Sequence, residues 1–402
     1  MKPVTSGSGA NRAGVRLLAT ASISRLAHDA TGIAVILGVL DRTGDAGLAG
    51  LVAAAFTFPA IVTGTIVGAQ IDRARSRRRL FLAAHALLTG SLVGVLLLAG
   101  HVPGPLLILL GLAAGVTAPV LTGGFSAVLP GVIAPTAWAR ANAADAASYN
   151  LAGIAGPVLV AAVAGLAGAG AALAAIAALS AIGLTLMIRV PLGTATKHGR
   201  ESLAASIADG LRLLWSNKLL RTTTAATTIN QLGQGLLPVA LLLFARQLGH
   251  DPANGAWLLS VFGAGALGGA LLSERLLRRW QPLTVMTFAV LTEIICFAAL
   301  SASPTLLIAL LIVALAGLGD GPLLAATFGV RQSSVPSHRY AQVVASAASL
   351  KTGAYALGTA IAGLLAAVCD ARQLVLLAAG VNASALVVLC VSPRHQSAQP
   401  SD

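Results

Sequence analysis

The chain has 402 residues, of which 56% are hydrophobic and only 10% are charged. A soluble globular protein carries about 25% charged residues, so this composition excludes an ordinary soluble domain and indicates that lipid surrounds much of the chain. The net charge of +13 does not indicate nucleic-acid binding, because the basic residues lie between apolar segments, where the positive-inside rule accounts for them.

Apolar segments long enough to cross a membrane, about 20 residues each, follow one another along the whole chain. In the first half they are 17–40, 47–70, 79–100, 104–127, 139–165 and 169–190. In the second half they are 222–246, 253–276, 282–302, 304–327, 341–366 and 373–392. The pattern predicts an all-α integral membrane protein of about twelve spans, with tails at 1–16 and 393–402 and with six-helix halves at 17–190 and 222–392.

The distribution of Lys and Arg predicts the orientation of the chain. With the N-terminus placed in the cytoplasm, only Arg42, Arg246 and Arg372 fall on the outer side, and Arg25 and Lys351 fall inside spans. All other basic residues are then cytoplasmic, as the positive-inside rule requires. No cleavable signal is recognisable before the first span, so we expect a multi-pass protein of the cell membrane with both termini in the cytoplasm.

The longest polar stretch, 191–221, separates the two halves. Within it Leu203, Ile207, Leu211 and Leu214 recur at helical spacing beside charged residues. The spacing predicts an amphipathic linker helix that lies on the cytoplasmic membrane surface.

A glycine, an aspartate and a basic cluster follow the second span. This stretch resembles the loop G-x-x-x-D-R-x-G-R-R of the major facilitator superfamily, although Arg75 stands where the family prefers glycine. An ordinary positive-inside loop would explain the arginines but not the spacing of the glycine and the aspartate. The resemblance implies a conformational gate made of Gly68, Asp72, Arg73, Arg77 and Arg78.

The fifth span carries a second resemblance, to the drug and siderophore exporter branch of the same superfamily, which includes enterobactin-exporter-like proteins. It rests on Asn142, Gly153, Gly156 and Pro157. The family's antiporter motif continues with Gly-Gly where this chain has Val160-Ala161, which weakens the antiporter assignment. The resemblance implies two pseudo-symmetric six-helix bundles around a central cavity, and transport by alternating access.

Ionisable residues within spans are costly and are therefore candidates for function. Arg25, His28, Asp29 and Gly32 in the first span share one helical face, which we expect to line a wet cavity. Alternatively, Arg25 and Asp29 pair along their own helix.

The second half supplies further polar groups. Asn230, Gln231 and Gln234 form a similar stripe on the seventh span, which would be either the matching cavity wall or hydrogen-bonded helix packing. Glu293 lies near the middle of the ninth span, where burial favours the neutral form of a carboxyl group, as a proton carrier requires. A neutral, packed glutamic acid is the alternative.

His85 and Asp145 lie nearer the cytoplasmic side and are weaker candidates for the pathway. Asp320 in the tenth span and Lys351 in the eleventh lie at similar depths on consecutive antiparallel helices. Either charge alone in the bilayer would be costly, so we predict that these two residues form an ion pair.

These features predict a monomeric secondary transporter that exports an amphipathic or hydrophobic organic molecule, with protons as the coupling ion and lipids around it. The alternatives are a nutrient or metabolite uptake transporter and a non-transporting receptor. The sequence contains no H-E-x-x-H, G-x-S-x-G or Walker A motif. We therefore expect no enzyme activity, no cofactor and no metal site.

Overall fold

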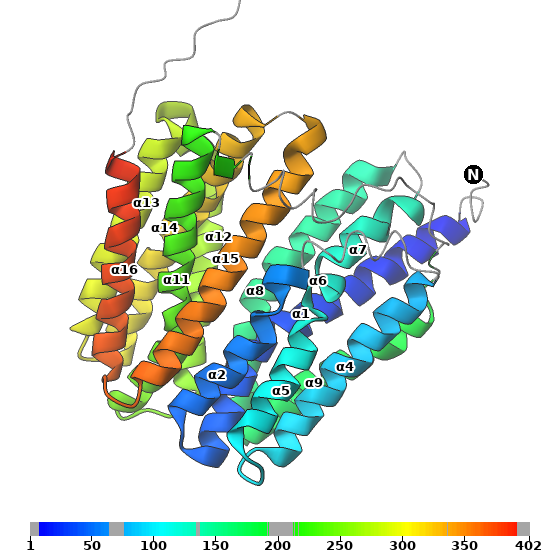
Figure 1. Ribbon diagram of the computed structural model, residues 1–402, viewed down its shortest axis with the longest axis horizontal. Coiled ribbons are helices and arrows are strands. Elements are labelled where there is room, and N and C mark those ends of the chain that lie inside the picture. Colours follow the sequence, from blue (N-terminus) through cyan, green and yellow to red (C-terminus); the bar gives the residue numbers. More distant parts are fainter. Residues whose placement is uncertain are drawn as a thin grey trace, which may run out of the picture.

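The computed structural model describes residues 8–63, 76–133, 137–190, 217–335 and 337–391, together with 192, 212, 214 and 215. Every regular element in these residues is a helix. The described chain begins at Ser8 and ends at Val391, and both lie at the same end of the molecule, which we call the termini side (Figure 1).

The first half of the chain forms one group of helices. Their bounds are α1 (Ser8–Thr43), α2 (Ala46–Thr57), α4 (Arg77–Leu98), α5 (Gly104–Gly115), α6 (Ala118–Leu121), α7 (Gly123–Val128), a 3₁₀ turn η1 (Leu129–Gly131), α8 (Trp138–Ala167) and α9 (Ala169–Ile188). Helix α1 packs against α2, α8 and α9, and α4 packs against α5 and α9.

The second half forms a similar group. Its helices are α11 (Lys218–Gln247), α12 (Asn254–Arg279), α13 (Pro282–Ser301), α14 (Leu306–Ser334), α15 (Ser337–Leu365) and α16 (Ala371–Val391). Helix α11 packs against α15 and α16, α12 packs against α14, and α13 packs against α14 and α16.

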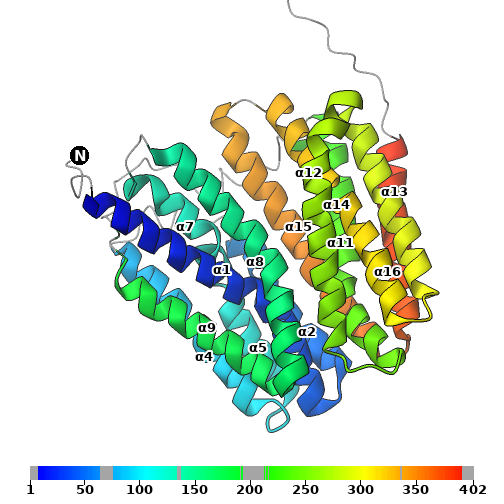
Figure 2. The same ribbon diagram turned by 180° about the vertical axis from the view of Figure 1, so that it is seen from behind.

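The two groups meet chiefly where α2 packs against α15 and α8 against α12, and α1 also contacts α11. Figures 1 and 2 show the ribbons of the two groups diverging toward the termini side and approaching each other toward the opposite side. Ten of the described helices are long and apolar enough to cross a membrane. Helix α15, which has 29 residues, and the series α5–α7 occupy the other two predicted spans, so the prediction of an all-α membrane fold in two helix bundles is confirmed.

The fourth predicted span, 104–127, is wrong as a single continuous helix. The structure divides it into α5, α6 and α7, with breaks after Gly115 and at Thr122. Pro119 has no N–H to donate to the helix, and two successive glycines, Gly123 and Gly124, destabilise helical backbone. Both signals are present in the sequence. The segment is nevertheless apolar along its whole length, and hydropathy alone therefore predicts one continuous span.

Other predicted boundaries differ where helices extend beyond an apolar core. Helix α1 begins at Ser8 instead of residue 17, and α14 continues to Ser334 instead of 327. Hydropathy identifies only the part of a helix that lipid surrounds. The predicted spans therefore do not include the polar ends of these helices. The predicted linker helix at 191–221 falls almost wholly outside the described residues, as does the C-terminal tail.

Two glycines allow the bundles to approach closely at α2 and α15. A Cβ atom placed on Gly50 would lie 2.7 Å from the Cα of Gly363, and a Cβ on Gly363 would lie 2.9 Å from the Cα of Gly50. These distances are too short for any side chain. Small residues at such a crossing let two backbones approach, which stabilises helix association in a membrane through van der Waals contact.

We therefore expect Gly363→Leu to separate α2 from α15 and to lower stability by about 1–3 kcal/mol, the usual cost of overpacking. The measurements are the melting temperature in detergent and the distance between spin labels on the two helices. Gly380→Leu on α16 is the matched control, because a Cβ there meets nothing within 4 Å. Equal effects of the two substitutions would contradict this role of the glycine contact.

Candidate substrate and proton pathway

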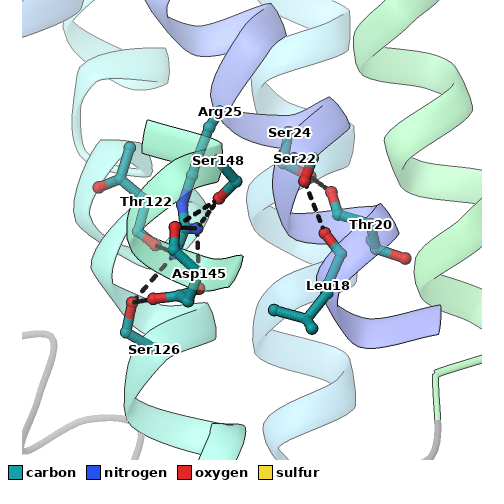
Figure 3. A network of polar contacts seen from close by, with 9 residues as sticks. All are labelled: Leu18, Thr20, Ser22, Ser24, Arg25, Thr122, Ser126, Asp145 and Ser148. Atoms are coloured by element: carbon teal, nitrogen blue, oxygen red, sulfur yellow. Dashed lines mark hydrogen bonds and ion pairs between the residues drawn. The ribbon is translucent and has the colours of Figure 1, made fainter. Parts of the chain in front are cut away.

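A buried arginine joins three segments of the first bundle. Arg25 on α1 is 0% exposed and forms an ion pair with Asp145 on α8, with 2.8 Å between Nη1 and Oδ1 (Figure 3). Nη1 also donates to the carbonyl oxygen of Asp145 and to Ser148 Oγ. Nη2 donates to the carbonyl oxygen of Thr122 at 3.2 Å and to Ser126 Oγ at 3.0 Å.

Both oxygens of the Asp145 carboxylate accept hydrogen bonds within this network. Its Oδ2 accepts a hydrogen bond of 2.6 Å from Ser126 Oγ, while Oδ1 binds Arg25. The ring of Tyr149 lies 3.7 Å from the Arg25 guanidinium carbon, a cation–π contact. The alternative pairing of Arg25 with Asp29 along α1 is therefore wrong, because the arginine reaches across to α8.

The break in the fourth span contributes to this network. Thr122 directly precedes α7 and Ser126 lies within it, where the chain resumes a helix after the break. Arg25 thus holds α7 and α8 against α1. Asp145, a weaker candidate by sequence, thus lies at the centre of this network. The sequence signal that could have found it is the polar face formed by Asp145, Ser148 and Tyr149 on α8.

Asp29 lies one turn beyond Arg25 and has no hydrogen-bond or ion-pair partner among the described residues. It precedes Asp41 by twelve residues, which places it about 18 Å from that end of α1. The residue is nevertheless exposed. The neighbouring His28 is partly buried and has no hydrogen bond within the described part of the chain.

Three carboxamides surround the buried Glu293 of α13. Its side chain is 0% exposed. Oε2 accepts hydrogen bonds from Asn230 Nδ2 at 2.5 Å and from Asn382 Nδ2 at 2.8 Å, and Oε1 accepts one from Gln234 Nε2 at 3.3 Å. The polar stripe of α11 therefore faces its own bundle here. Sequence reasoning missed Asn382, whose signal is an amide within the otherwise apolar last span.

Gln234 joins Glu293 to a second carboxyl group. Its Nε2 donates to Asp320 Oδ1 at 2.7 Å, and its Oε1 accepts a 3.0 Å hydrogen bond from Gln231 Nε2. An amide group has two N–H donors, so one side chain bridges both acids. Five of the predicted pathway residues thus meet in one network: Asn230, Gln231, Gln234, Glu293 and Asp320.

The predicted ion pair between Asp320 and Lys351 is not formed in this conformation. Neither residue has an ion-pair partner within 4.0 Å in the described ranges. Each lies fourteen residues from both ends of its helix, α14 or α15, and the two charges attract each other. Asp320 Oδ1 instead accepts a hydrogen bond from Gln234 Nε2 at 2.7 Å.

The helix-five motif brings α8 against α1 beside Asp29. A Cβ on Gly156 would lie 3.1 Å from the backbone nitrogen of Ala30, so a side chain here would be crowded against the backbone of α1. Pro157 follows inside α8. A Cβ on Gly153 would meet nothing within 4 Å. Asn142 belongs to α8, but its side chain is outside the described part of the structure.

The loop motif is described only in part. Gly68, Asp72 and Arg73 lie outside the described residues, so their role as a gate stays a prediction. Arg78 donates a hydrogen bond to the carbonyl oxygen of Ile188 at the end of α9. Arg77 is the first residue of α4. No cluster of three or more His, Cys, Asp or Glu side chains suited to a metal ion occurs in the described ranges.

A family model described as the Major Facilitator Superfamily matches residues 17–350 and 223–402. The chain belongs to this superfamily. It is similar to the multidrug efflux pump Tap of Mycobacterium tuberculosis (strain ATCC 25618 / H37Rv), with 31% identity over 374 residues that cover 88% of this chain and 87% of the relative. The Tap pump of Mycolicibacterium fortuitum is 29% identical, over 82% of this chain and 83% of the relative.

Among solved structures, the nucleoside transporter NupG superposes on this superfamily member with a TM-score of 0.76, covering 96% of this chain and 100% of the transporter at 14% identity. That likeness shows the fold alone. The relatives named as multidrug pumps confirm the resemblance to drug exporters of the superfamily. The enterobactin-exporter-like part of that resemblance stays a prediction.

We expect Arg25→Gln and Asp145→Asn each to destabilise the protein by about 3–5 kcal/mol, because each leaves a buried charge without its partner. The double variant should recover part of this loss. The measurement is thermal unfolding in detergent, read as a double-mutant cycle. The exposed pair Arg278–Glu274 is the control, and its disruption should have little effect. Additive losses would show that the two residues act independently.

Proposed function

We propose that this protein exports small amphipathic or hydrophobic organic molecules in exchange for protons, by alternating access between its two bundles. Membership of the superfamily and similarity to multidrug efflux pumps support transport and favour export over uptake. The observation that carries proton coupling is the network in which Gln234 joins Glu293 to Asp320.

The environment of Glu293 suits a group that gains and loses a proton. Burial favours its neutral form, whereas the three amide donors favour the ionised form. An amide presents both N–H donors and a carbonyl acceptor, so Asn230, Gln234 and Asn382 can rotate to satisfy either state. Asp320 is less buried than Glu293. Protons would therefore enter at Asp320 and be held at Glu293.

The proposal includes an orientation and an organisation. Both termini face the cytoplasm of a monomer in the cell membrane, and the unit boundaries fall at 17–190, 191–221 and 222–392. The basic ends of α4 and α12, with Arg77 and Arg278, lie on the termini side, which agrees with the positive-inside rule. Asp72 would belong to the gate between conformations on that side.

The deciding experiment is flux in proteoliposomes under an imposed pH gradient. Thermal-shift screening of the purified protein first identifies a compound that binds. Efflux of that compound should follow the pH gradient and stop when an ionophore collapses it. Flux that ignores protons and depends on sodium or ATP would remove the proposed mechanism.

We expect Glu293→Gln to abolish the dependence of flux on the pH gradient while the protein stays folded, because the amide keeps the size of the side chain but cannot release a proton. Exchange of substrate across the membrane without a gradient should persist. The measurement is the pH profile of transport. A profile like that of the wild type would show that Glu293 has a structural role and does not carry the coupled proton.

Gln234→Leu should uncouple the two acids, since the leucine cannot donate to either one. Gln231→Leu is the matched control: it removes the hydrogen bond to Gln234 but leaves both acids bridged. We expect proton flux per substrate to fall at least about tenfold in the first variant, the scale of a lost hydrogen bond to a charged group, and to stay near the wild-type value in the second. The reverse order would contradict the bridging role.

A further inference from the structure

Two buried hydroxyl groups on α11 differ from those of the neighbouring threonines. The hydroxyls of Thr223, Thr227 and Thr327 each donate to a carbonyl oxygen one turn back in their own helix, which is a common bond for a threonine inside a helix. The Oγ1 atoms of Thr224 and Thr228 are also buried, but they have no hydrogen-bond partner among the described residues.

A buried hydroxyl without a partner is costly, because in water it would both donate and accept hydrogen bonds. Thr224 is 1% exposed. Buried polar groups that have no protein partner typically bind internal water. The side chains of Thr224 and Thr228, four residues apart on one helix, have Cβ atoms about 5–6 Å apart. One water molecule can bridge two hydroxyls at that spacing, with hydrogen bonds of about 2.8 Å each.

These two hydroxyls lie between two places where α11 meets α14. Near the start of α11, Leu220 belongs to an apolar cluster with side chains of α14 and α15. Deeper in the membrane, Gln234 donates a hydrogen bond to Asp320. Thr224 and Thr228 follow the first residue of α11 by six and ten residues, or about 9 and 15 Å. The hydroxyls therefore lie between the termini side and the acidic network.

We infer that Thr224 and Thr228 bind internal water, and that this water carries protons between the acidic network and the cytoplasm. The inference rests on the proposed function, because it names the route of the coupled proton. A proton that leaves Asp320 passes to the nearest water and leaves a carboxylate behind. Each water then passes one proton to the next along the hydrogen bonds, and the last one releases a proton to the cytoplasm.

This route lies inside the second bundle, apart from the space between the bundles. Helix α11 packs chiefly against helices of its own bundle, and the side chain of Thr224 is almost completely buried. When substrate is exchanged for protons, the arriving substrate occupies the space between the bundles while the proton leaves. A separate route inside one bundle allows both events in the same conformation.

The test follows the protonation of Glu293 by infrared spectroscopy after a rapid change of pH, with the purified protein in detergent and no substrate present. The C=O band of this carboxyl group is the one that Glu293→Gln lacks. Joint Thr224→Val and Thr228→Val substitution removes both hydroxyls and keeps the shape of the side chains. We expect the same final change in the band at a rate lower by at least about tenfold, the scale of one lost hydrogen bond.

Joint Thr223→Val and Thr227→Val substitution is the matched control. It removes two hydroxyls from the same turns of α11, but these hydroxyls donate to their own helix, so the rate should equal that of the wild type. Joint Thr224→Ser and Thr228→Ser substitution keeps both hydroxyls and should also preserve the rate.

All of these variants leave the charged groups of the neighbouring helices in place. These groups are Glu293 on α13, Asp320 and Arg331 on α14, and Lys351 on α15. A slower change in the band therefore reports the loss of the hydroxyls and not a change in charge. The melting temperature of each variant verifies folding, and Thr224→Val alone carries the test if the double valine variant does not fold.

An unchanged rate in the double valine variant would overturn the inference, because protons would then use the space between the bundles. An equally low rate in the control or in the serine variant would also overturn it, since the hydroxyls would not set the rate. Both outcomes leave the proposed function intact. A Glu293 band that ignores pH in the wild type would instead remove proton coupling, and this route with it.

Discussion

A charged side chain inside a bilayer must find a partner, because lipid cannot solvate it. The organisation of the first bundle follows from this constraint. Arg25 reaches from α1 to Asp145 on α8 and, with the same guanidinium, to Thr122 and Ser126 at the break in the fourth span. A single buried cation therefore fixes the relative positions of three segments and stabilises a helix break that would otherwise leave backbone groups without partners.

The second bundle meets the same constraint with neutral groups. Glu293 has three amide donors, and no ion pair with it occurs among the described residues. An ion pair holds its two charges in place, whereas an amide shell can satisfy a carboxyl group in either protonation state. The first bundle is thus held by a fixed ion pair, whereas the second contains a carboxyl group whose neighbours can accommodate either protonation state.

One of the helices at the contact between the bundles also touches the second network's helix α11. Gly50 and Gly363 bring α2 and α15 into backbone contact, and α15 also carries Lys351 and Tyr355, one helical turn apart. Thr359 on the same helix donates a hydrogen bond of 2.8 Å to the carbonyl oxygen of Gly235 on α11. Movement of α15 relative to α2 would therefore also act on α11 next to Gln234.

The sequence by itself determined the all-helical membrane fold, nearly all span positions and the superfamily, because hydropathy, length and short motifs are local properties. It also singled out Asn230, Gln234, Glu293 and Asp320, which the structure joins in one network. Only the tertiary structure decided the partners. Arg25 finds Asp145 across 120 residues, and Asn382 reaches Glu293 across 89. Such pairings depend on how each helix is rotated and tilted against its neighbours, and packing alone sets that rotation.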